Sequence, residues 1–147
     1  MISQSVSVTG RCGACGGVLT RNAGQRIDRD EVRWDAETTC GSCPATTRAG
    51  SHEPPTPTPT PTPEEIRRLL LQEHGPAHLT LTDGTANLIS VTRALSRAHG
   101  LSLGEARALS AELRTTGLTG TLVEMEHLAT TLRARDVSVT VTPTRTA

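Results

Sequence analysis

The sequence contains no Phe, no Tyr and a single Trp, and all 15 of its basic Lys or Arg positions are Arg. A hydrophobic core in this 147-residue chain must therefore be aliphatic, because aromatic side chains are nearly absent. We attribute the lack of Lys to a GC-rich genome rather than to chemistry. No apolar run approaches the roughly 20 residues that span a membrane. The first ten residues also lack the charged start and apolar stretch of a signal peptide, so we expect a cytoplasmic protein.

Neither end of the chain carries a large excess of charge of one sign. Residues 1–50 carry six Arg against five acids, and residues 64–147 carry nine against nine. Binding to a phosphate backbone relies on a surplus of positive charge that releases counterions. Nucleic acid is therefore a possible partner that the sequence does not favour.

All four cysteines fall into two Cys-x-x-Cys pairs, Cys12 with Cys15 and Cys40 with Cys43, separated by 24 residues. Two such pairs can supply the tetrahedral four-sulfur shell of a structural zinc ion. Glycines in and beside the pairs permit tight turns. We therefore predict a zinc ribbon over residues 5–47, with Zn²⁺ as its cofactor. Disulfides are one alternative, which a reducing compartment disfavours. A redox dithiol is the other, and it is disfavoured because no helical pattern follows either pair.

The only aromatic residue, Trp34, lies in a short strand pattern in which Val32 and Trp34 alternate with polar residues. Trp34 could cap the small core of the ribbon, since such a domain buries little else. It could also be an exposed contact for stacking or for a partner. The first interpretation is the one we favour.

Residues 48–63 include four consecutive Thr-Pro dipeptides. Alternating Pro neither pairs in a sheet nor continues a helix, so we predict a semi-rigid, polyproline-like linker between two domains. Recognition by a proline-binding domain and modification of the threonines are the alternatives.

Residues 64–147 alternate between helical and strand periodicity. Capping boxes begin predicted helices at Thr62, Ser102 and Thr121. Strand patterns are predicted at residues 79–82 and 137–141, a turn at Asp83-Gly84, and a weak strand at 116–120. The economical packing is an α+β domain with a three-stranded sheet covered by helices on one face.

The segment from Gly100 to Arg107 reads Gly-Leu-Ser-Leu-Gly-Glu-Ala-Arg, and the segment from Ala86 to Arg93 precedes it in a helical pattern. These two segments resemble the C-terminal domain of the bacterial ribosomal stalk protein, which recruits translation GTPases. The resemblance covers roughly 65 residues and implies a ribosomal stalk-like domain over 64–147. Where the family has dimerising helices and an Ala-rich hinge, this sequence has the cysteine pairs and the Thr-Pro segment.

The resemblance also implies a partner-binding face on the paired helices. Carried over by position, it comprises Ile89, Ser90, Thr92, Arg93, Leu103, Glu105, Ala106 and Arg107. Three family cations are replaced by Leu88, Ser96 and Gly104, so much of the basic character that steers acidic partners is lost.

A second resemblance is to the Clp protease adaptor that reads N-terminal degrons. Leu81-Thr82-Asp83 stands where that family carries Leu-x-Asn-Asp, but the Asn, the second acid and the pocket His are missing. A degron pocket needs those amine-binding groups.

No pattern of catalytic residues stands out in the chain. The five histidines are spaced so that each is better explained by capping or by exposure than by catalysis. We therefore predict a non-enzymatic adaptor with no catalytic residues. Its stalk-like domain would bind a protein partner, with a translation GTPase as one candidate, and its ribbon would bind a second. The alternatives are a nucleic-acid-binding regulator that uses the ribbon and a Clp-adaptor-like degron binder.

Overall fold

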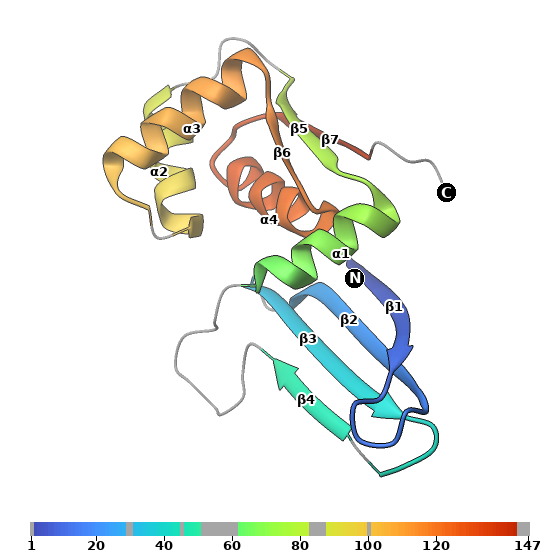
Figure 1. Ribbon diagram of the computed structural model, residues 1–147. Coiled ribbons are helices and arrows are strands. Elements are labelled where there is room, and N and C mark those ends of the chain that lie inside the picture. The colour runs from blue at the N-terminus through green and yellow to red at the C-terminus, as the bar shows by residue number, and fades with distance from the viewer. Residues whose placement is uncertain are drawn as a thin grey trace. The chain divides into compact units, whose positions relative to one another are not determined.

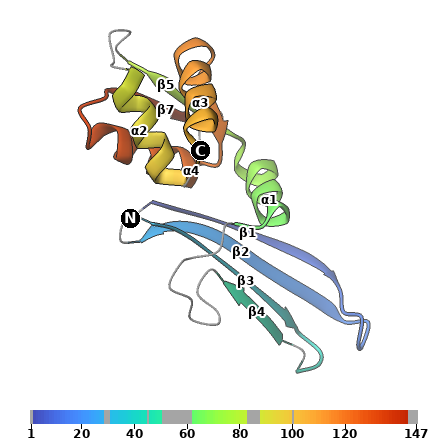
Figure 2. The same ribbon diagram turned by 90° about the vertical axis from the view of Figure 1, so that its left-hand side faces the viewer.

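The computed structural model describes residues 2–28, 31–44, 46–50, 62–82, 88–99 and 101–143. The chain divides into two compact units, Met1–Glu73 and His74–Ala147. The described residues form four helices and two antiparallel sheets, so the predicted α+β class is confirmed. Figures 1 and 2 show the elements of each unit.

The N-terminal unit is a four-stranded antiparallel sheet with one helix, and its strands follow one another in the order β1-β2-β3-β4 (Figure 1). The two turns that carry the cysteine pairs, β1–β2 and β3–β4, lie at the same end of this sheet because each joins neighbouring antiparallel strands. The elements are β1 (Ser3–Arg11), β2 (Val18–Asp28), β3 (Glu31–Cys40), β4 (Thr46–Gly50) and α1 (Glu64–His74).

One face of this sheet carries a small apolar cluster, which α1 covers. Strand residues alternate between the two faces, so Val6 and Ala23 lie opposite one another on the covered face. The helix buries Ile66 and Leu70 against them, and both side chains are at most 1% exposed. Trp34 packs against the same cluster, so its predicted role as a cap on the small core is confirmed.

Polar contacts at the start of α1 join the helix to β2. Gln25 is 2% exposed, and its Nε2 donates a hydrogen bond to Oγ1 of Thr62 at 2.8 Å. The Arg21 guanidinium forms an ion pair with the Glu65 carboxylate. Thr62 and Glu65 are thus engaged with the sheet, whereas the sequence predicted that they form a capping box.

The division between the two units falls after Glu73 rather than at the expected residues 63 and 64, and it places α1 with the N-terminal sheet. Residues 48–50, expected in the linker, are part of β4. Residues 51–61 lie outside the described part of the chain. They connect β4 to α1, and both elements belong to one unit. The Thr-Pro segment is consequently a connection within the N-terminal unit rather than a spacer between two units.

The C-terminal unit has the predicted three-stranded sheet, with the strand order β6-β5-β7. The weak strand expected around 116–120 is present as β6, whereas the turn expected at Asp83-Gly84 lies outside the described residues. The elements are β5 (Ala77–Leu81), α2 (Leu88–His99), α3 (Leu103–Thr115), β6 (Leu118–Gly120), α4 (Leu122–Arg133) and β7 (Val139–Pro143).

The helices cover one face of this second sheet, as Figure 2 shows. On β5 the buried Ala77 and Leu79 alternate with the more exposed His78 and Thr80, which is the pattern of a half-buried strand. The helices contribute aliphatic side chains to the same core, including Leu95, which is 0% exposed. This aliphatic core is what the lack of aromatic residues requires.

Two of the predicted helix starts are confirmed by their caps. The Ser102 hydroxyl accepts a hydrogen bond from the backbone N–H of Glu105 at the start of α3. Thr121 and Glu124 form a reciprocal capping box at the start of α4. These local contacts satisfy N–H groups that have no partner within the helix.

None of the helices in the described segments combines the length and the apolar character that crossing a membrane requires.

The assignment of α1 to the N-terminal unit predicts the effect of Leu70→Ala. Truncation of this fully buried side chain should destabilise the N-terminal unit by roughly 2–5 kcal/mol, since the side chain is lost and a cavity is left. Trp34 lies in that unit and is the only Trp, so denaturant unfolding followed by its fluorescence reports on this unit. Leu95→Ala, an equally buried change in the other unit, should leave the Trp34 transition in place. An unshifted Trp34 transition in Leu70→Ala would contradict the assignment.

Candidate metal centre

The first cysteine turn is closed by its own backbone. The N–H of Cys12 donates to the carbonyl of Gly17, and the N–H of Gly16 donates to the carbonyl of Cys12, both at 2.8 Å. Gly16 has φ +74°, a left-handed conformation that glycine adopts without strain. The chain therefore reverses tightly enough to direct both cysteines of this pair to one point.

The second turn is held beside the first by strand pairing. Leu19 in β2 is the register partner of Cys40 in β3, and the N–H of Gly41 donates to the carbonyl of Val18 at 3.1 Å. A Cβ placed on Gly17 would stand 2.6 Å from Ser42 Oγ, so the two turns approach closely at this glycine. The sheet thus fixes the separation of the two cysteine pairs.

The four predicted ligands come together at this end of the sheet. All four sulfur atoms lie within 4.8 Å of one another, and the four cysteines are free thiols rather than disulfides. Two of the sulfur–sulfur contacts join the two turns: Cys12 Sγ lies 3.8 Å from Cys43 Sγ, and Cys15 Sγ lies 3.4 Å from Cys40 Sγ. A metal ion held by these four atoms would link the β1–β2 turn to the β3–β4 turn.

Backbone N–H groups point at two of the sulfurs. Gly17 N lies 3.4 Å from Cys15 Sγ, and Ser42 N lies 3.3 Å from Cys40 Sγ. Each donor is two residues after the cysteine that it contacts, so both turns use the same local geometry. Such contacts partly offset the charge of a thiolate and orient it as a ligand.

The same environment gives the cysteine thiols different pKa values. The N–H of Ser42 is the main cause that lowers the pKa of Cys40 to about 6. For Cys15, the N–H of Gly17 has the largest single effect and favours the thiolate. The thiols of Cys40 and Cys43 together with burial outweigh it and raise the pKa of Cys15 to about 12. The backbone N–H groups of Ala14 and Cys15 lower the pKa of Cys12. A cation that binds here must therefore displace protons, so its affinity depends on pH.

The eight residues of the expected partner-binding face divide into exposed and buried positions. Ala106 is 0% exposed and Thr92 is 6% exposed, and Thr92 Oγ1 lies 3.0 Å from Ser110 Oγ in the core. These two positions hold α2 against α3 and do not offer surface to a partner. The exposed or half-exposed positions are Ile89, Ser90, Arg93, Leu103, Glu105 and Arg107.

His78 makes contacts through both nitrogens of its ring. Its Nδ1 lies 3.2 Å from Thr119 Oγ1, and its Nε2 lies 2.8 Å from the carbonyl oxygen of Thr116. Both ring nitrogens are thus engaged with β6 and the turn before it. This arrangement is that of a residue that fastens a strand.

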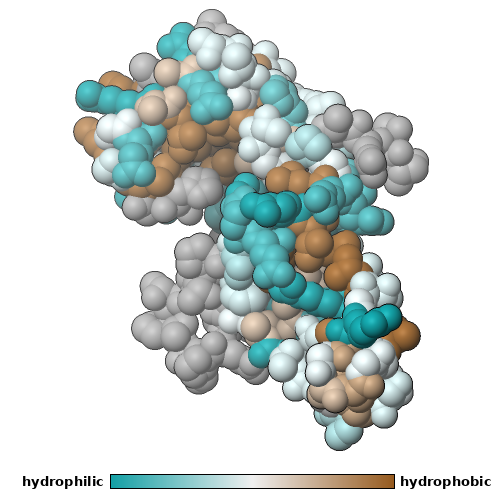
Figure 3. Space-filling view, viewed as in Figure 1, coloured by the Kyte–Doolittle hydropathy of each residue, from teal (hydrophilic) through white to brown (hydrophobic). Residues whose placement is uncertain are grey.

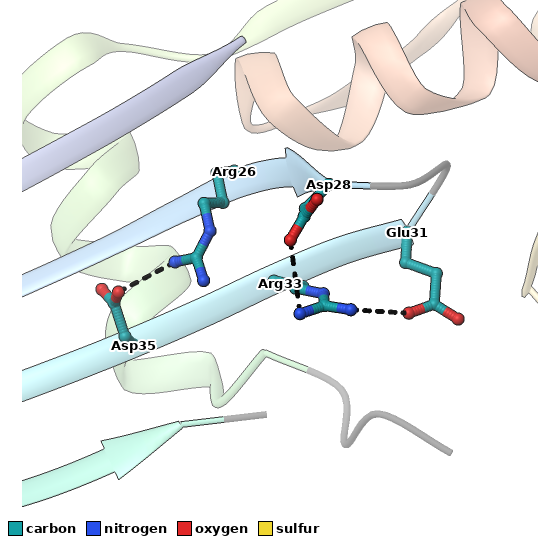
Figure 4. A network of polar contacts seen from close by, with 5 residues as sticks. All are labelled: Arg26, Asp28, Glu31, Arg33 and Asp35. Carbon is teal, nitrogen blue, oxygen red and sulfur yellow. Dashed lines mark hydrogen bonds and ion pairs between the residues drawn. The ribbon is translucent and has the colours of Figure 1, made fainter. Parts of the chain in front are cut away.

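Sequence reasoning missed a network of ion pairs on the polar face of the N-terminal sheet, part of which is shown in Figure 4. The pairs are Arg26–Asp35 at 3.0 Å, Arg33–Asp28 at 3.3 Å, Arg33–Glu31 at 3.8 Å and Arg48–Glu37 at 3.6 Å. The alternation of charged and apolar residues along β3 was the available signal. These arginines border a hollow of about 450 Å³, whose lining includes acids as well as bases.

Comparison with known proteins finds no matching family, no matching curated protein and no matching solved structure.

The close approach of the two turns predicts that Gly17→Ala weakens metal binding. The added methyl group would collide with Ser42 Oγ and Cβ, at 2.6 and 2.7 Å, and would push the turns apart. Titration with Co²⁺, whose absorption reports tetrahedral thiolate ligands, should show at least about a tenfold loss of affinity, the range seen when groups that support metal ligands are altered.

Gly13→Ala is the matched control in the same turn. Nothing lies within 4 Å of a Cβ at this position, so its affinity should stay close to that of the unaltered protein. Equal affinities for the Gly17→Ala and Gly13→Ala proteins would contradict the proposed packing of the two turns.

Proposed function

We propose that the protein is a non-enzymatic adaptor whose N-terminal unit is stabilised by a structural zinc ion. Four thiolates are the ligand set that zinc prefers in structural sites, and no position is left for a substrate. Free cysteines that meet from two turns support this assignment over disulfides. The zinc would substitute for the larger core that the sheet and its single helix lack.

The partner-binding role is assigned to the pair formed by α2 and α3. The observation that carries it is the exposure of two large aliphatic side chains, Ile89 at 63% and Leu103 at 58%. Figure 3 shows hydrophobic atoms among hydrophilic ones over these helices. Exposed aliphatic side chains on a small domain are candidates for contact with another protein.

The exposed residues beside these side chains define the chemistry of the partner. Arg93 is exposed on α2, and Arg107 and Glu105 are exposed on α3. The surface is therefore apolar at two points and carries charge of both signs, which suits a protein surface with a hydrophobic contact and an acidic group. Its resemblance to the stalk protein's factor-binding face makes a translation GTPase one candidate.

Nucleic acid is the less favoured partner because three arginines on the polar face of the N-terminal sheet are already paired with acids. Arg26, Arg33 and Arg48 each form an ion pair with a carboxylate on the same face. Phosphate contacts would have to compete with those carboxylates, which leaves little net attraction.

The adaptor proposal predicts the loss of a protein partner in two variants. Leu103→Asp places a charge in the contact, and Arg107→Glu reverses one beside it, so each should reduce recovery of the partner from a bacterial lysate at least about tenfold. Both side chains are exposed, so the variants should keep the unfolding transition of the unaltered protein.

Val18→Asp and Arg68→Glu are the matched controls, since both side chains are exposed but lie in the N-terminal unit. The controls should retain the partner that the helix-pair variants lose. Recovery that nuclease abolishes and that Leu103→Asp and Arg107→Glu do not change would instead favour nucleic acid bound by the N-terminal unit.

A further inference from the structure

Strand β1 forms one edge of the N-terminal sheet. It is hydrogen-bonded to β2, and the strand order places nothing on its other side within the described residues (Figures 1 and 2). Nine consecutive residues, Ser3–Arg11, pair with β2 without a bulge. An edge of this length presents a row of backbone groups that another strand can pair with.

The other three edge strands carry features that discourage such pairing. Strand β4 has five residues and includes Arg48, β6 has three residues, and β7 has five and ends at Pro143. Short length, charge and proline are the usual means by which proteins protect sheet edges.

Strand β1 has none of these features over most of its length. It contains no proline, and its only charged residue is Arg11 at the end. Its side chains are otherwise Ser, Thr, Val, Gln and Gly, so nothing in it repels an approaching strand. The contrast with the other edges indicates that β1 is an interface.

We propose that β1 pairs with β1 of a second copy of this chain, antiparallel, about a two-fold axis at Ser7. The two sheets then join into one of eight strands. In this register Val6 of each copy faces Val8 of the other, on the face that α1 covers. Facing β-branched residues stabilise antiparallel strands.

The sequence of β1 is complementary to itself in this register. All nine residues of each strand are paired, and directly opposed residues point to the same face. Ser7 meets Ser7 at the axis, and the one charged residue, Arg11, faces Ser3 at the far ends. A shift by one residue would instead pair Val6 and Val8 with residues that belong to the polar face of the other copy's sheet. The shifted register is therefore disfavoured.

The test is the mass of the full-length protein in solution. Sedimentation equilibrium should give a mass approaching twice the 15.5 kDa of one chain as concentration rises. Ser7→Glu places two carboxylates opposite each other at the axis, and like charges in that position destabilise pairing. Its mass should stay at 15.5 kDa over the same concentrations.

Thr47→Glu is the control, because it adds the same charge at an exposed position of β4, the other edge of the same sheet. This variant should form the dimer normally. Ser7→Lys alone should be monomeric, but an equal mixture of the Ser7→Glu and Ser7→Lys proteins should recover a dimer, since opposite charges then meet at the axis. Recovery in the mixture also shows that both variants are folded.

A single-chain mass for the unaltered protein at every concentration would overturn the proposal. So would a dimer that Ser7→Glu leaves intact, or a mixture of the two charged variants that remains monomeric.

Discussion

The meeting of four cysteine sulfurs at one end of the sheet is the constraint on which, in our proposal, the N-terminal unit depends. Each pair comes from a different turn, and each turn connects a different pair of strands. An ion bound to all four would therefore link the β1–β2 hairpin to the β3–β4 hairpin at this end of the sheet. The two hairpins are otherwise joined there by hydrogen bonds between β2 and β3. Because the cluster of apolar side chains under α1 is small, we propose that this link would have a large share in the stability of the unit.

The helix α1 has the complementary role at the sheet face. It covers Val6 and Ala23, and it is joined to β2 through the Gln25–Thr62 hydrogen bond and the Arg21–Glu65 ion pair. The chain leaves β4, passes through the Thr-Pro segment and returns as α1 to the same unit. The cysteine cluster and the helix thus lie at two separate parts of the sheet, one at its end and one on its face.

Features that depend on neighbouring residues could be predicted from the sequence. The cysteine spacing identified all four members of the cluster, and the Ser102 and Thr121 patterns identified two helix starts. The alternation around β5 and β7 identified a half-buried sheet. In each case the physical cause, a tight turn, a cap or a two-residue period, acts within a few residues.

Features that depend on distant residues could not be predicted. The spacing of Ile66 and Leu70 shows that α1 has an apolar face, but it does not say which sheet that face covers. The long strands β1 and β2 are rich in Ser, Thr and Arg, so they gave little hydrophobic signal. The resemblance placed Thr92 and Ala106 on a partner-binding face, whereas packing between α2 and α3 buries both.

The central claim is that the metal centre maintains the N-terminal unit while the C-terminal unit is stable through its own aliphatic core. Hydrogen–deuterium exchange of the zinc-loaded protein, measured before and after removal of the metal by a chelator, tests this claim most directly. We expect the amides of β1–β4 and α1 to lose protection, with the largest change beside Cys12 and Cys40, and those of residues 77–143 to keep theirs. Unchanged protection of β1–β4 after the metal is removed would contradict the account.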